Sequence, residues 1–155
     1  MYLVDTDVIS ELRKRDKANA GVVTFFRNAA ANDTSLYLSA VSIGELRRGV
    51  ELIRYRGDAR QAQRLERWLG KLLIEYSESI LPFDADTAQI WGRLRVPHPE
   101  NPLDKQIAAT ALIYDLTLVT RNVRHFAGAG VKLLNPFSER RISSSTREAV
   151  RVGIP

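Results

Sequence analysis

The chain has 155 residues, a formal net charge of +5 and a sequence pI near 9.8. This length predicts one domain with a core large enough to need no covalent staples. The lack of cysteine excludes disulfides and thiolate metal sites, and a zinc site is disfavoured because the chain has only two histidines. The apolar N-terminus ends at Asp5, so we expect neither a signal peptide nor a membrane span. A small cytosolic enzyme or binding domain fits these bounds, and the positive charge fits a polyanionic partner.

The first half of the chain alternates between strand-like and helix-like segments. Short apolar runs predict strands over residues 2–4 and 36–40. Apolar residues at helical spacing predict helices over residues 5–15, 18–31, 42–55 and 58–76. Thr6 or Asp7 is the expected N-cap of the first helix.

The alternation continues in the second half. We expect strands over residues 80–83, 117–120 and 131–134, a helix from Asp84 or Asp86 through Leu94, a loop over 96–102 and a helix over 103–114. This order predicts an α/β fold with a mostly parallel central sheet of about four to five strands, covered by helices on both faces.

The composition changes near residue 137. Residues 138–155 hold four arginines against two glutamates, three consecutive serines and no aromatic residue. We therefore expect one domain over residues 1–137, followed by a basic C-terminal tail over 138–155. Composition favours a disordered tail, and the alternative is a basic arm that contacts RNA or a protein partner.

Oxygen-bearing side chains recur where predicted strands end or predicted helices begin. They are Asp5, Glu45, Asp104 and Asn122. Ligands of an open α/β sheet bind beyond the carboxyl ends of the strands, so parallel strands would bring these side chains to one edge. Three carboxylates held together require a counter-charge, and a hard divalent cation suits them best. Asp7 is a further candidate ligand from the first helical turn.

Each of these positions also has a structural interpretation. Glu45 lies three residues after Ser42, which matches a capping box. Asp104 suits the first turn of its helix, and Asn122 suits a turn. Asp5 differs, because it ends a strand expected to be central, where a buried carboxylate without a partner is costly.

Five segments of the chain, taken in order, resemble PIN-domain proteins of the VapC/FitB toxin type. They are residues 1–10 (MYLVDTDVIS), 38–49 (LSAVSIGELRRG), 80–84 (ILPFD), 104–111 (DKQIAATA) and 118–122 (LVTRN). The resemblance extends from the first residue to about residue 137. One such segment would be weak, whereas five in register are specific.

The resemblance implies a PIN fold and an endoribonuclease that depends on Mg²⁺ or Mn²⁺ and cleaves RNA with a metal-activated water. By motif position Asp5, Glu45 and Asp104 match the family's acidic metal site, and all three are expected ligands. Asn122 stands where the wider family often carries Asp, so we expect a weaker ligand or a water-orienting group there. Together the four are the predicted catalytic residues.

The resemblance also implies partners. Toxins of this type bind a cognate antitoxin protein and typically form homodimers. The expected partners are therefore RNA, an antitoxin and a second copy of the chain. The arginines nearest the site are candidate contacts for RNA phosphates: Arg47, Arg48, Arg121 and Arg124. Each of them is equally well explained as a solvated charge.

Two other functions fit part of the sequence. In a phosphatase of the haloacid-dehalogenase type, Asp5 would be the nucleophile and Asp7 the acid/base. Against it, no convincing lysine or late acidic pair follows, and the Glu45 motif has no place in that family. A non-catalytic module that binds RNA or metal is the other alternative, and Asn122 favours it.

Overall fold

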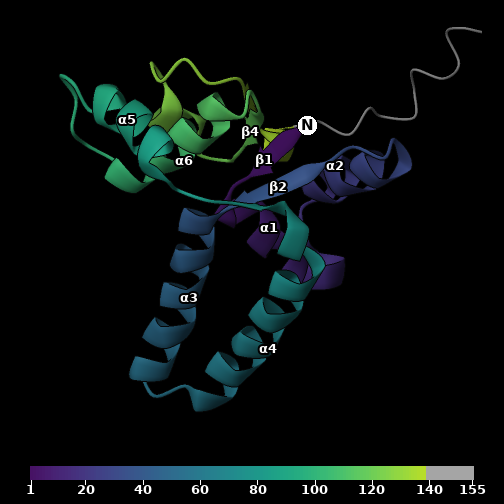
Figure 1. The fold of residues 1–155 in the computed structure, drawn as a ribbon. Coiled ribbons are helices and arrows are strands. Elements are labelled where there is room, and N and C mark those ends of the chain that lie inside the picture. Colours follow the sequence, from purple (N-terminus) through teal and green to yellow (C-terminus); the bar gives the residue numbers. More distant parts are fainter. Residues whose placement is uncertain (139–155) are drawn as a thin grey trace, which may run out of the picture.

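The structure, shown in Figure 1, is a computed structural model that describes residues 1–138. Within these residues five strands form one sheet. The strands are β1 (Tyr2–Val4), β2 (Leu36–Ser39), β3 (Ile80–Leu81), β4 (Thr117–Val119) and β5 (Leu133–Leu134). Their order is β3-β2-β1-β4-β5, and every neighbouring pair is parallel. The predicted α/β class with a parallel sheet is confirmed.

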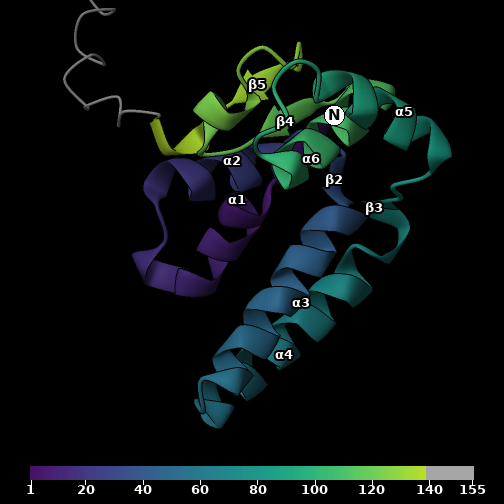
Figure 2. The same cartoon turned by 90° about the vertical axis from the view of Figure 1, so that its left-hand side faces the viewer.

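Six α-helices connect the strands within residues 1–138. They are α1 (Thr6–Glu11), α2 (Ala20–Ala31), α3 (Ala40–Tyr55), α4 (Ala59–Glu75), α5 (Ala85–Leu94) and α6 (Pro102–Ile113). Short 3₁₀ segments lie at η1 (Leu12–Lys17), η2 (Ser77–Ser79), η3 (Val123–Phe126) and η4 (Pro136–Ser138). Helices α3 and α4 form a hairpin that projects away from the sheet (Figure 2). None of the helices described is long and apolar enough to cross a membrane.

Different helices bury the two faces of the sheet. Side chains alternate between the faces along each strand, so neighbouring residues enter different cores. Val4 and Val119 belong to a core completed by α1, α2, α3 and α4, which includes Val8, Val22, Val50 and Leu69. Leu3 and Leu118 belong to a second core, completed by α6 and η3, which includes Ile107, Ala108, Ala111 and Phe126. Helices therefore cover both faces, as predicted.

The predicted boundaries are wrong at the first and third helices. The helix expected over residues 5–15 ends at Glu11 and continues as the 3₁₀ segment η1, in which Arg15 has a φ of 50°. Helix α3 begins two residues earlier than expected, because Ser39 is its N-cap and accepts a hydrogen bond from the Val41 backbone N–H. The capping box predicted for Ser42 and Glu45 is therefore wrong.

The remaining differences are small. The last predicted strand is reduced to Leu133–Leu134, and the third ends at Leu81. Asp84 is the N-cap of α5, one of the two residues expected there. Residues 139–155 of the predicted basic tail lie outside the described residues.

The strand order defines where a ligand can bind. From β1 the chain proceeds outward to β2 and β3, then crosses back to place β4 on the other side of β1. This reversal is a topological switch point, and the crevice beyond the carboxyl ends of the two strands is the usual ligand site of such sheets. Val4 pairs with Val119 at the ends of β1 and β4, so Asp5 and Thr120 are the first residues beyond this edge.

Candidate active site

Asp5 is buried at the switch point, and neutral donors hold its carboxylate. Asp5 is only 4% exposed. Oδ1 accepts the Thr6 backbone N–H at 2.8 Å, and Oδ2 accepts the Thr120 hydroxyl at 2.8 Å. Within residues 1–138 no salt bridge joins Asp5 to a cation. The carboxylate is therefore fixed in position without being neutralised.

The pKa of Asp5 reflects this environment. Burial is the largest effect and raises the pKa above the ordinary value, while the hydrogen bonds from Thr120 and Thr6 act in the opposite direction. The negative charge of Asp104 raises it further. The structure therefore brings Asp5 and Asp104 close enough to repel each other, although they lie 99 positions apart in the sequence, at residues 5 and 104.

Asp7 adds a third carboxylate to this edge. Its Oδ2 accepts the backbone N–H of Arg121 at 3.1 Å, but its buried Oδ1 has no hydrogen-bond partner within residues 1–138. Burial, followed by the negative charge of Asp5, raises the pKa of Asp7 to about 6. An unpaired buried carboxylate oxygen is costly unless a ligand or a proton satisfies it.

Asp104 lies in the first turn of α6, where the sequence predicted it. Its Oδ2 lies 2.8 Å from Nδ1 of His125, which comes from η3. The Asp104 side chain is 29% exposed and that of His125 is 50% exposed, so this pair stands at the solvent side of the site. Sequence reasoning did not assign His125 this role, because only the fold places η3 beside α6.

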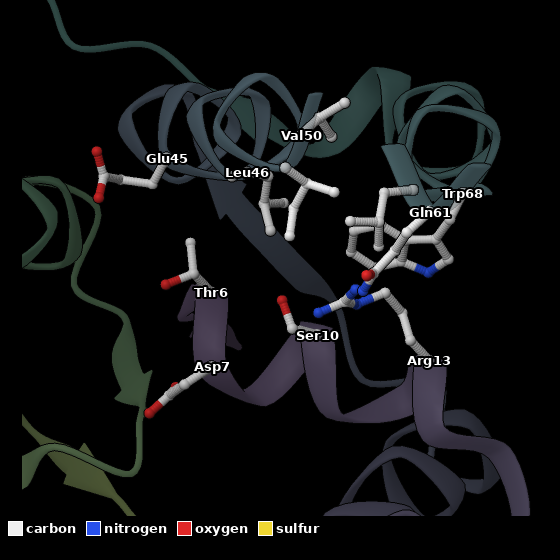
Figure 3. A pocket seen from close by; sticks show the side chains of 12 residues that line it. Thr6, Asp7, Ser10, Arg13, Glu45, Leu46, Val50, Gln61 and Trp68 are labelled. Carbon is white, nitrogen blue, oxygen red and sulfur yellow. The ribbon is translucent and has the colours of Figure 1, made fainter. Parts of the chain in front are cut away.

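Glu45 approaches from α3 and faces the same cavity as Asp7. The cavity has a volume of about 390 Å³ and lies between α1 and the α3–α4 hairpin. In Figure 3 the carboxylates of Glu45 and Asp7 and the hydroxyl of Thr6 all turn toward the same side, where the green part of the chain passes. Because Ser39 caps α3, the Glu45 carboxylate is not needed for a capping box.

Asn122 is linked to Asp5 through Thr120. The Asn122 backbone N–H donates to the Thr120 hydroxyl at 3.1 Å, and this hydroxyl in turn donates to Asp5. Asn122 is exposed and precedes η3 without forming a side-chain cap. Asn122 therefore lies at the edge of the site, and its side-chain amide does not cap η3.

The four predicted RNA-binding arginines differ in environment. Arg47 is paired with Glu66 at 2.7 Å and with Glu51 at 3.4 Å, in a network across the α3–α4 hairpin. The Arg121 guanidinium lies 4.8 Å from the centre of the Phe137 ring. Arg48 and Arg124 are exposed.

The residues at this edge suit a hard divalent cation in their chemistry. Asp5, Asp7 and Asp104 present an excess of negative charge with one orphan oxygen, which is the donor set that Mg²⁺ and Mn²⁺ prefer. In the described part of the chain, however, no three acidic or histidine side chains already converge as a finished ligand set. His125, which is bound to Asp104, is one of the groups on the solvent side of this edge.

Comparison with known families agrees with this geometry. The PIN domain model matches residues 2–131. The chain therefore belongs to the PIN-domain family, in the group of toxins of the VapC/FitB type. The resemblance seen in the sequence is confirmed, and the haloacid-dehalogenase alternative is set aside.

This chain covers nearly the whole length of individual relatives. Toxin FitB of Neisseria gonorrhoeae is 36% identical over 146 residues, which are 90% of this chain and 100% of FitB. VapC ribonuclease Y4jK of Sinorhizobium fredii is 32% identical over 142 residues, which are 88% of this chain and 98% of that protein. The crystal structure of FitAcB from Neisseria gonorrhoeae aligns with a TM-score of 0.76 and 34% identity, over 90% of this chain and 100% of that chain.

Proposed function

We propose that the chain is an endoribonuclease that depends on Mg²⁺ or Mn²⁺, and that it is the toxin of a toxin–antitoxin pair. The observation that carries the proposal is the buried Asp5 carboxylate, which lacks a cationic partner within residues 1–138 and lies beside the charge of Asp104. A carboxylate in this state is stabilised by a bound cation. The names of relatives at 32% and 36% identity, a ribonuclease and a toxin, support the same conclusion.

In this proposal Asp5, Glu45 and Asp104 hold the metal, and Asp7 is the additional carboxylate available to it. The bound metal supplies an activated water and stabilises charge on the phosphoryl oxygens. Thr6 and Thr120 fix the orientation of Asp5, which spares the site a reorganisation cost during the reaction. Glu45 stands on a separate helix and positions the attacking water.

Asn122 contributes an amide oxygen in place of a carboxylate. An amide oxygen is a hard ligand and also orients a water, but it carries no charge. The proposed site thus has one negative charge fewer than a site with Asp at this position. We propose that Asn122 orients water or binds the metal weakly.

Cleavage of labelled RNA by the purified chain tests the proposed activity. We expect cleavage with Mg²⁺ or Mn²⁺ and none with EDTA. Asp5→Asn and Glu45→Gln should each reduce the rate by more than about 100-fold, since each removes a proposed ligand. Glu75→Gln is the matched control, because Glu75 is exposed at the end of α4, away from the lining of the cavity.

Two different results would contradict the proposed activity. RNA that is bound but never cleaved, with any divalent metal, would support the non-catalytic module instead. Cleavage that persists in EDTA and in both variants would point to a contaminating nuclease or to a different site.

We also propose that the chain pairs with a cognate antitoxin and forms a homodimer. FitB, a relative with 36% identity, is a toxin. The alignment with the FitAcB crystal structure covers the whole of the matched chain in that structure. Co-expression with the protein encoded beside it, followed by light scattering, tests both points. A 1:1 toxin to antitoxin ratio with two toxin copies is expected, and a monomer that captures no neighbour protein would contradict the proposal.

A further inference from the structure

A groove lined by cationic side chains lies between η1 and α4. It has a volume of about 550 Å³, and six of its lining residues are Arg13, Arg15, Arg64, Arg67, Trp68 and Lys71. No aspartate or glutamate lines it. Within residues 1–138 none of its five cations takes part in a salt bridge, in contrast to Arg47 and Arg54 on the other side of the hairpin.

Local structure explains why these cations converge. Arg64, Arg67 and Lys71 recur at spacings of three and four along α4, so they share one face of that helix. Arg13 and Arg15 come from η1, whose path turns at Arg15, where φ is 50°. Two separate elements therefore direct the same charge into one groove.

Five like charges that have no carboxylate partner within residues 1–138 raise the energy of the isolated protein. Like charges near a protein surface repel each other, and a polyanion bound between them would relieve this repulsion. Arg64 and Lys71 are seven positions apart, which corresponds to about 10 Å along the helix axis. This length allows contact with more than one phosphate of a nucleic-acid strand, whose repeat is a few ångströms.

The groove is continuous with the candidate active site. Arg13, Gln61, Leu65 and Trp68 line both this groove and the cavity that holds Glu45 and Asp7. Figure 3 shows Arg13, Gln61 and Trp68 at one end of that cavity and Glu45 and Asp7 at the other. A polymer bound in the groove would thus pass directly to the acidic edge.

Trp68 provides an apolar surface among the charges. The Arg13 guanidinium lies 5.2 Å from the centre of the Trp68 ring, over its face. Sites for single-stranded nucleic acid combine cations that pair with phosphates and aromatic or arginine side chains on which bases stack.

We propose that the groove between η1 and α4 binds the phosphates of a single-stranded RNA segment and leads it to the acidic edge. The proposal rests on the proposed function for the identity of the polymer. It assigns RNA binding to Arg13, Arg15, Arg64, Arg67 and Lys71. An acidic segment of a partner protein is the competing occupant, and the aromatic surface between the cations favours RNA over it.

Binding measured separately from cleavage tests the proposal. Asp5→Asn serves as the background so that RNA stays intact, and the probe is a short fluorescent single-stranded RNA measured by anisotropy over a range of salt concentrations. The groove variant adds Arg64→Ser, Arg67→Ser and Lys71→Ser. The matched control adds Arg27→Ser, Arg56→Ser and Arg93→Ser, which are exposed arginines of other elements. Circular dichroism and thermal melting verify that both variants fold.

The groove variant should bind RNA at least about tenfold more weakly, and its slope of log K against log salt should fall by about 2, since each lost phosphate contact contributes about 0.7. The control should retain both values. Equal binding by the groove variant and its background would overturn the proposal. So would loss of binding to a polyglutamate peptide with RNA binding unchanged, which would assign the groove to an acidic protein segment. RNA binding that depends on the groove, in a wild-type chain that never cleaves RNA, would support the groove and reject the nuclease.

Discussion

The hydroxyl of Thr120 donates a 2.8 Å hydrogen bond to Oδ2 of Asp5 and thereby joins the ends of β1 and β4 at the switch point. Both residues are buried, and they lie 115 positions apart. Thr120 also accepts the Asn122 backbone N–H. One hydroxyl thus connects the most buried proposed metal ligand to the loop that carries the weakest one.

Replacing Thr120 by valine should destabilise the protein by about 1–3 kcal/mol, because it leaves a buried Asp5 oxygen without its donor while preserving the side-chain shape. Loss of this hydrogen bond should also raise the pKa of Asp5 further, since the bond acts to lower it. Urea denaturation measures the first effect. Thr117→Val is the matched control, because Thr117 is half-buried in the adjoining strand β4 and its side chain forms no hydrogen bond within residues 1–138. Equal destabilisation by both variants would contradict the role of the hydroxyl.

Asp7 should make the metal-free protein less stable as the pH rises. Its folded pKa of about 6 lies above the ordinary value of 3.8, so the folded state binds more protons between these values than the unfolded state does. Protonated Asp7 therefore contributes its full share to the free energy of unfolding below about pH 4. This contribution is lost as the pH rises through about 6. Solvent screening of this half-buried group limits the loss to about 1–2 kcal/mol.

The difference between wild type and Asp7→Asn isolates this effect from other carboxylates, several of which have lowered pKa values. Guanidinium denaturation in EDTA should show that Asp7→Asn gains stability over wild type between pH 4.5 and 7. A difference that stays constant across this range would show that Asp7 does not titrate as described.

Asn122→Asp should strengthen metal binding. The variant adds a carboxylate at the edge of the site, where the wild type carries a neutral amide. Because residue 122 is exposed, we expect a gain of only about 2- to 10-fold in Mn²⁺ affinity, together with a small loss of stability without metal. Titration calorimetry measures the affinity. Asn32→Asp, at an exposed asparagine after α2, is the control for added charge. An unchanged affinity would place residue 122 outside the metal site.

The order of elements and the edge that carries the acidic residues were predictable from the sequence. Apolar runs such as residues 2–4 and 117–120 mark parallel strands, and a carboxylate directly after the first run marks their carboxyl edge. The capping box at Ser42 failed because α3 follows β2 directly, so Ser39 reaches the N-cap position first. Local patterns do not reveal which of two nearby serines starts a helix.

The contacts across the site required the fold. The Asp104–His125 pair and the Asp5–Thr120 bond each join separate elements, and no spacing rule anticipates them. The same holds for Arg47, which resembled a free cation in the sequence but faces Glu66 across the hairpin. Helical spacing predicts a core position for Trp68; the structure packs it against the core and also places it on the cationic groove, which spacing does not predict.

The central claim is that the acidic edge of the switch point holds a divalent cation, and titration calorimetry with Mn²⁺ on the metal-free chain tests it most directly. We expect saturable binding at pH 7 that weakens as the pH falls below 6, where Asp7 becomes protonated. Binding should be lost in Asp5→Asn and in Asp104→Asn and retained in Glu75→Gln. Mn²⁺ binding of equal strength in all four proteins, or none in the wild type, would contradict the account.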